Sequence, residues 1–243
     1  MTATQIPTFK SHRGRLRTRR REALRTLLPR YGVEASGDRL DPVAVFGRRA
    51  PLVLEIGSGM GEWTAEMAAA APERDYLAAE VHLPGVANLL LLIESRGLRN
   101  VRVVPGDALT LLRERLAPDS LAAIEVFYPD PWPKQRHHKR RLFQPAHVAL
   151  LRSRLAPGGT LRAVTDVEEY AKVIRRTLSE DPELVNAYPG WAPAPQTART
   201  KYERRALQEG RAIYELLFRR APLTRAAHAP GIRPVYGRPD ARR

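Results

Sequence analysis

The sequence predicts an α/β fold in which a mostly parallel sheet is covered by helices on both faces. Between residues 51 and 220, short apolar runs alternate with longer segments of helical periodicity. Proline or glycine separates many of these segments, as is typical at the ends of helices and strands. Such alternation is expected for parallel strands joined by crossover helices.

Five short apolar runs are expected to form strands, and a late run is expected to add one more. The predicted strands are Leu52–Ile56, Tyr76–Ala79, Val101–Val104, Leu121–Tyr128, Thr160–Val164 and Ala212–Phe218. The predicted helices are Glu62–Ala71, Gly85–Ser95, Ala108–Leu116, Gln144–Leu155 and Val167–Ser179. Segments 31–50 and 186–198 contain turn-forming residues and are expected to be loops.

The chain of 243 residues divides into a basic arm, a central domain and a basic tail. Residues 1–50 form the arm; six of nine consecutive residues from position 13 are arginine, and residues 18–29 are expected to form a short basic helix. Residues 51–220 form the domain. Residues 221–243 hold five arginines and one aspartate, which predicts a mobile basic tail.

Charge and composition narrow the classes of partner and chemistry. The 41 lysines and arginines exceed the 26 acidic residues, and the net charge of +15 favours a nucleic-acid partner. The sequence has no cysteine, which excludes thiolate metal sites and the cysteine nucleophile that pyrimidine C5 methylation normally needs. We expect no metal site. No apolar stretch approaches the roughly 20 residues of a membrane span, and a cytoplasmic location is predicted.

A glycine-rich turn follows the first predicted strand, with Gly57, Gly59 and Gly61 at alternate positions. Glycines let a backbone turn tightly and approach a ligand at the carboxyl end of a strand. A dinucleotide-binding turn would need its third glycine at position 62, which is Glu62. The spacing resembles instead the first motif of class I methyltransferases. That resemblance implies a Rossmann-like, mostly parallel seven-stranded sheet and S-adenosylmethionine as cofactor.

Two acidic residues end the next two strands. Glu80 ends the second strand, where a carboxylate can accept hydrogen bonds from ribose hydroxyls; the alternative is a surface residue. Asp107 follows the third strand, where a carboxylate can accept from an adenine amino group. The alternative for Asp107 is a helix N-cap, and one side chain can fill both roles.

The segment after the fourth strand holds an aspartate between two prolines. Pro129 and Pro131 restrict the backbone on either side of Asp130, so its carboxylate is held with little freedom. Trp132 offers either a ring for stacking a base or a packed core side chain. Five Lys/Arg and two His then lie within residues 134–141, which favours phosphate contact over a merely solvated loop.

Together these residues resemble the tRNA (guanine-N7-)-methyltransferase family. The matching segments are LEIGSGMG (54–61), EVHLPGV (80–86), GDA (106–108), FYPDPWPKQRHHKRR (127–141), TD (165–166) and TKYERR (200–205). The resemblance covers roughly residues 50–220, and its most specific part is the segment that begins at Pro129.

The resemblance implies a function and a set of site residues. The family transfers a methyl group from S-adenosylmethionine to N7 of a guanine, at position 46 of the tRNA variable loop. Asp130 is expected to be catalytic, and the cofactor contacts are expected to be Glu55, Gly57, Gly59, Gly61, Glu80, Asp107 and Asp130. The expected substrate-binding residues are Lys134, Asp166, Thr200, Lys201, Tyr202 and Glu203. The expected RNA contacts are Arg136, His137, His138, Lys139, Arg140 and Arg141.

One geometric expectation joins these assignments. The side chains of Glu55, Glu80, Asp107 and Asp130 should line one crevice at the rim of the sheet. The partner is expected to be tRNA, with no obligatory protein partner and a monomeric or homodimeric state. The alternatives are another methyltransferase acting on nucleic acid, a nicotinamide oxidoreductase, and a non-catalytic RNA-binding protein with a Rossmann-like fold.

Overall fold

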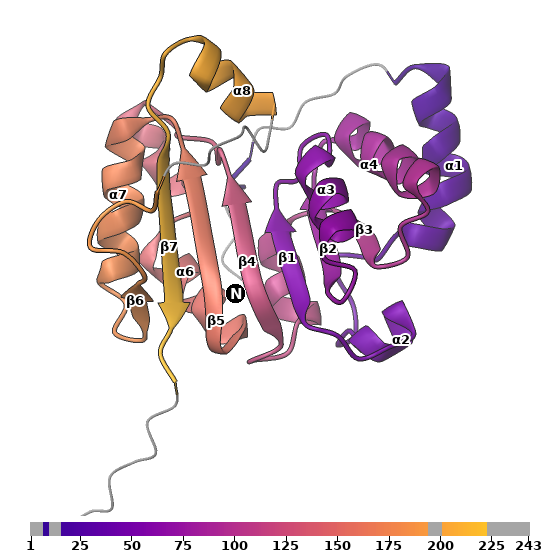
Figure 1. Cartoon of the computed structure of the whole chain (residues 1–243), viewed down its shortest axis with the longest axis horizontal. Coiled ribbons are helices and arrows are strands. Elements are labelled where there is room, and N and C mark those ends of the chain that lie inside the picture. Colours follow the sequence, from indigo (N-terminus) through magenta and orange to yellow (C-terminus); the bar gives the residue numbers. More distant parts are fainter. Residues whose placement is uncertain (1–6, 10–15, 194–200, 223–243) are drawn as a thin grey trace, which may run out of the picture.

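The computed structural model describes residues 7–9, 16–193 and 201–222, and a seven-stranded sheet forms the centre of this part (Figure 1). The order of the strands is β3-β2-β1-β4-β5-β7-β6. Their bounds are β1 (Leu52–Ile56), β2 (Asp75–Glu80), β3 (Val101–Pro105), β4 (Leu121–Phe127), β5 (Leu155–Thr165), β6 (Leu184–Asn186) and β7 (Tyr214–Arg220). The predicted α/β class and mostly parallel sheet are confirmed.

The pairing of the strands places a ligand site in the middle of the sheet. Strands β1 to β5 pair in parallel, whereas β7 runs antiparallel to β5 and β6. β1 lies between β2 and β4, so the order of the chain through the sheet reverses at β1. In open α/β sheets, ligands bind beyond the carboxyl ends of the strands at such a reversal.

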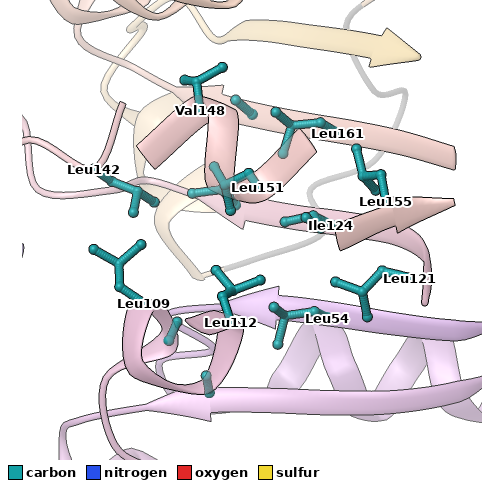
Figure 2. Packing of buried hydrophobic residues seen from close by; sticks show 14 of the residues in the cluster. Leu54, Leu109, Leu112, Leu121, Ile124, Leu142, Val148, Leu151, Leu155 and Leu161 are labelled. Atoms are coloured by element: carbon teal, nitrogen blue, oxygen red, sulfur yellow. The ribbon is translucent and has the colours of Figure 1, made fainter. Parts of the chain in front are cut away.

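Helices cover both faces of the sheet, as Figure 1 shows. On β1, Val53 packs with α1, α3 and α4, and the adjacent Leu54 packs with α5, η1, α6 and α7 on the opposite face. Figure 2 shows the second cluster, in which leucines from sheet and helices interdigitate. The bounds are α1 (Thr18–Tyr31), α3 (Glu62–Ala70), α4 (Leu83–Arg96), α5 (Ala108–Thr110), η1 (Leu111–Arg115), α6 (Pro145–Arg154) and α7 (Glu168–Ser179).

Three further helical elements complete the fold: α2 (Pro42–Phe46), the 3-10 helix η2 (Gln135–Arg140) and α8 (Lys201–Gln208). In Figure 1, α8 lies beyond the arrowheads of β4 and β5, at the end where their carboxyl termini meet. None of the described helices is both long and apolar enough to cross a bilayer.

Several predicted elements were wrong in type or extent. Segment 31–50 contains α2, which the Asp41 side chain caps by accepting from the amide of Val43. The predicted helix 108–116 is a single α turn followed by the π-helix η1. Leu111 and Leu112 of η1 and the following Leu116 are all buried.

Two differences concern the end of the sheet. β6 was not predicted, because three residues are too short to show a period of two. The last strand is shifted to Tyr214–Arg220, since its bounds follow from pairing with Thr160–Thr165 of β5. The basic helix α1 runs two residues further than predicted, to Tyr31, whose hydroxyl donates to Glu94 of α4 at 2.7 Å.

Candidate active site

A cavity of about 330 Å³ opens at the carboxyl ends of β1, β2, β3 and β4, where the order of the strands reverses. Most of its lining residues belong to the ends of these four strands and to the segments that directly follow them. Gly57 and Gly59, Glu80, Asp107 and Asp130 all line it. The fold therefore brings three of the four predicted acidic residues to one cavity.

The glycine turn presents its backbone to this cavity. Gly57, Gly59 and Gly61 all have positive φ angles, of 76°, 56° and 74°, which residues with a Cβ atom rarely adopt. A Cβ atom on Gly57 or Gly59 would meet no other atom within 4 Å. The space beside these two residues is therefore open to a ligand, as the sequence predicts for a turn that approaches one closely.

Glu80 supports the turn from the end of β2. One of its carboxylate oxygens accepts from the amide of Gly59 at 2.6 Å, and the other accepts from the amide of His82 at 2.7 Å. Burial raises the pKa of the Glu80 carboxyl, and the hydrogen bonds from His82 and Gly59 oppose that shift. A carboxylate has about four acceptor sites, so Glu80, which lines the cavity, can also accept from a ligand hydroxyl.

Asp107 is a helix N-cap at the end of β3. Its side chain accepts from the amide of Leu109 at 3.1 Å, in the first turn of α5. The N-cap role that the sequence suggested for Asp107 is therefore present in the structure. The second oxygen of Asp107 accepts from the hydroxyl of Thr110 at 3.5 Å. Because Asp107 also lines the cavity and each carboxylate oxygen can accept more than one hydrogen bond, Asp107 stays a candidate acceptor for a ligand amino group.

Glu55 does not line the cavity, so the predicted crevice of four acids was wrong at this residue. Its side chain is 3% exposed and accepts a hydrogen bond from the hydroxyl of Thr64 on α3. Burial raises its pKa to about 8; the bond from Thr64 opposes the shift, and the nearby carboxylates of Glu125 and Glu80 add to it. Glu55 therefore connects β1 to α3 behind the glycine turn.

The backbone around Asp130 is strained, and a hydrogen bond from a side chain restrains it. Tyr128 and Trp132, on either side of the Pro129–Pro131 turn, have φ angles of 50° and 43°. Such conformations in residues other than glycine cost energy and cluster at functional sites. The guanidinium of Arg141 donates to the carbonyl of Pro131 at 2.8 Å. Asp130 is thus held at the edge of the cavity by its own turn and by a side chain from further along the chain.

Trp132 does not offer a free ring for a base. Its side chain is buried, and its indole nitrogen donates to the carbonyl of Thr8 at 3.1 Å. The guanidinium of Arg140 lies 3.7 Å from the centre of the ring, and the ring of His137 contacts its edge. Of the two roles open from the sequence, the packed one is the role that the structure supports.

The predicted RNA-contact loop forms η2 and divides into two groups. Lys134, Arg136 and Lys139 are exposed and available to phosphates. Arg140 donates to backbone carbonyls of residues 7–9, and Arg141 is buried with its guanidinium 4.9 Å from the centre of the Tyr170 ring. We therefore revise the prediction: Arg141 is a structural residue, because phosphate contact would require it to leave the interior.

The remaining predicted substrate-binding residues belong to α8, to the position before it and to the end of β5. Asp166 follows β5 and forms an ion pair with Arg211. Glu203 is fully buried on α8, and Arg204 joins α8 to Glu62 of α3 at 3.2 Å. Thr200 lies outside the described residues, and Lys201 and Tyr202 are described only as the first turn of α8.

Sequence analysis missed several residues near the cavity, among them Thr8, Phe9 and Gly85. Thr8 and Phe9 line the cavity although they precede β1 by more than forty residues. No local pattern distinguishes them within the basic arm. Gly85 brings α4 against the glycine turn, because a Cβ atom there would lie 2.0 Å from the carbonyl oxygen of Gly59. Gly85 could have been predicted, because it lies in EVHLPGV (80–86), one of the segments that resemble the family.

The sheet order, the glycine turn and the acidic strand ends define a methyltransferase of the Rossmann-like class. Solved structures agree on the fold alone: a 16S rRNA (adenine(1408)-N(1))-methyltransferase from Catenulisporales acidiphilia superposes with a TM-score of 0.52 at 15% identity, over 79% of this chain and 95% of that one. An rRNA methylase from Streptococcus thermophilus gives a TM-score of 0.50 at 13% identity, over 71% and 87% of the two chains.

Sequence comparisons name the family. A family model described as "Putative methyltransferase" matches residues 49–216. The tRNA (guanine-N(7)-)-methyltransferases of Nitrosospira multiformis and Bordetella pertussis are 48% and 47% identical to this chain, over 88% and 90% of it and 94% and 87% of their own lengths. That of Streptomyces coelicolor is 47% identical over 89% of this chain and 81% of its own. The chain belongs to the tRNA (guanine-N(7)-)-methyltransferase family.

Proposed function

We propose that this protein transfers a methyl group from S-adenosylmethionine to N7 of a guanine in tRNA, in the variable loop. The observation that carries the proposal is the position of Asp130. Its carboxylate is held in a strained turn at the edge of the same cavity that Glu80 and Asp107 line. Family membership at 46–48% identity supports the same reaction.

The cavity fits the cofactor in size and in chemistry. Its volume of about 330 Å³ lies within the range of pockets that hold small molecules. The open space beside Gly57 and Gly59 admits a ligand against the backbone. Glu80 would accept from ribose hydroxyls and Asp107 from an adenine amino group. When bound there, the cofactor would supply an electrophilic methyl group on a sulfonium.

The residues of the chain position the base and stabilise charge; they need not remove a proton. Guanine N7 carries a free lone pair, so its methylation releases no proton and the ring becomes cationic. A preorganised carboxylate at Asp130 stabilises that developing charge. It can also accept from the N1–H and amino group of guanine, which fixes the orientation of the base. Asp166 and α8 supply further contacts from the neighbouring end of β5.

Exposed basic side chains would bind the phosphates of the tRNA. On α1, Arg19 and Arg21 are exposed, and on η2 Arg136 and Lys139 are exposed. Phosphate contacts of this kind fix the register of a nucleic acid and leave base recognition to the site itself. The target base would be turned out of its stack to reach the cavity. A monomer or homodimer in the cytoplasm, without an obligatory protein partner, stays a prediction.

The direct test is methyl transfer to unmodified tRNA transcript from a labelled donor. We expect label in tRNA and strand cleavage by chemistry specific for 7-methylguanosine at one guanosine of the variable loop. A matched transcript with adenosine at that position is the control and should stay unlabelled. Label at another base, or no label with donor bound, would refute the assigned reaction.

A further inference from the structure

Residues 7–9, which we call the N-terminal strap, lie against the cavity that the domain forms. Thr8 and Phe9 belong to the lining of the cavity, together with the turns after β1 to β4. Thr8 is separated by 48 positions from Ile56, another lining residue. The strap therefore adds a wall from a distant part of the sequence, whereas most of the other lining residues belong to the ends of β1 to β4 or to the segments that directly follow them.

The strap is held by hydrogen bonds from two side chains of the segment that follows Asp130. Arg140 donates to the carbonyl of Pro7 at 3.1 Å and to that of Phe9 at 2.8 Å. Trp132 donates from its indole nitrogen to the carbonyl of Thr8 at 3.1 Å. Three consecutive carbonyls thus find donors. The two bonds from Arg140 are charge-assisted, and hydrogen bonds of that kind are among the stronger ones in proteins.

The two donor side chains also hold one another. The guanidinium of Arg140 lies 3.7 Å from the centre of the Trp132 ring, a stacked cation–π arrangement. Trp132 is two residues from Asp130 and adopts a positive φ angle of 43°. The strained segment therefore has two roles. It places Asp130 at the cavity, and through Trp132 it holds the strap.

We propose that the N-terminal strap is part of the methyl-donor site, with Phe9 a binding residue and Arg140 and Trp132 positioning residues for the strap. This rests on the proposed function, because it takes the cavity to be the cofactor site. The strap covers the bound donor and limits its exchange with solvent. Arg140 is then required for donor affinity, a role different from the phosphate contact predicted from its basic loop.

The test compares the binding of S-adenosylhomocysteine, without tRNA, by the full-length wild-type protein and three variants. Phe9→Ala and Arg140→Ala should each weaken binding by at least about tenfold. Arg136→Ala, which removes an exposed arginine from the same 3-10 helix, should bind within about twofold of wild type. Trp132→Phe keeps an aromatic face for Arg140 but replaces the indole with a smaller phenyl ring that lacks the N–H donor to Thr8, and it should give an intermediate loss.

A second measurement separates the strap from the phosphate role. The salt dependence of tRNA binding should lose about one unit of slope in Arg136→Ala and stay unchanged in Arg140→Ala. In the wild-type protein, amide exchange in the peptide that contains residues 7–9 should slow when S-adenosylhomocysteine binds.

Each failure has a distinct meaning. A wild-type protein that does not bind S-adenosylhomocysteine would refute the proposed function itself. A wild type that binds it, with Phe9→Ala and Arg140→Ala equal to it in affinity and no slowing of exchange, would overturn the strap alone. If Arg140→Ala reduced the salt dependence of tRNA binding as much as Arg136→Ala does, Arg140 would be a phosphate contact.

Discussion

The carboxylate of Glu80, at the end of β2, accepts a 2.6 Å hydrogen bond from the amide of Gly59 in the turn after β1. The two strands are parallel neighbours, so their carboxyl ends meet at the same edge of the sheet. Glu80 therefore holds the glycine turn in place, and because it also lines the cavity it can accept hydrogen bonds from a ligand. The site is thus built by a contact between the ends of adjacent strands.

Glu80→Gln is expected to weaken S-adenosylmethionine binding by about 10- to 100-fold, because it removes a charged acceptor from two backbone amides and from the ligand. Isothermal titration measures the change. Glu73→Gln, a control at an exposed glutamate just before β2, should bind normally. Equal affinity of Glu80→Gln and wild type would show that the carboxylate does not hold the donor.

Gly85→Ala is expected to reduce both donor affinity and stability. The new Cβ atom would lie 2.0 Å from the carbonyl oxygen of Gly59, so α4 or the glycine turn must shift. Overpacking of this kind costs about 1–3 kcal/mol, which urea unfolding measures. The matched control is Gly190→Ala, where a Cβ atom meets nothing within 4 Å. An unshifted midpoint for Gly85→Ala would contradict the close approach.

Asp130→Asn is expected to lower kcat by about 100- to 1000-fold, since it removes a preorganised charge at the position where the base becomes cationic. The affinity for tRNA should change by less than about twofold, because phosphate contacts lie elsewhere. Single-turnover methyl transfer and filter binding measure the two effects. Asp38→Asn, at an exposed loop position, is the control. A parallel loss of tRNA binding would indicate a structural role for Asp130.

Neutralising Arg136 and Lys139 together is expected to weaken tRNA binding and to lower the salt slope by about two units, one for each lost phosphate contact. Arg141→Gln should instead lower the free energy of unfolding, because Arg141 is buried against Tyr170 and donates to Pro131. Titrations over a range of salt, and urea unfolding, separate the two. A stable Arg141→Gln protein with reduced slope would contradict the revised assignment.

Glu55 is expected to make stability fall as the pH rises. Burial raises the pKa of its carboxyl from 4.5 to about 8, so between these values the folded protein holds a proton that the unfolded chain has released. The free energy of unfolding then decreases with pH, by at most about 1.4 kcal/mol per pH unit. This contribution is fully present below the unfolded pKa and lost as the pH passes the folded pKa.

The comparison with Glu55→Gln isolates this contribution from other titrating groups. The wild-type free energy of unfolding minus that of Glu55→Gln should decline between about pH 5 and pH 8, as measured by urea unfolding at several pH values. Glu73→Gln serves as an exposed control and should give a flat difference. A flat difference for Glu55→Gln as well would mean that Glu55 is ionised in the folded protein.

Sequence patterns predicted the fold and much of the site because both depend on local signals. β1 was predicted with its observed bounds, since a run of this length between Pro51 and Gly57 suits a buried strand and is too short for a helix. Glu80 and Asp107 were predicted as site residues because Glu80 lies at the carboxyl end of one parallel strand and Asp107 follows the next. The orientation of Glu55 escaped prediction, because alternation along β1 and the contact with Thr64 turn it away from the cavity.

By itself, the sequence determined the α/β class, the glycine turn at Gly57–Gly61 and the aspartate between prolines at position 130. These three features follow from the period of the hydrophobic pattern, from the backbone restrictions of glycine and proline, and from charge. All of these depend on residues that are close together in the sequence. Only the tertiary structure decided that Arg140 and Trp132 hold residues 7–9 at the cavity, across 131 or more positions for Arg140 and 124 for Trp132. The reason is physical: a guanidinium or an indole has donors to satisfy, and which carbonyl it meets depends on how distant segments pack.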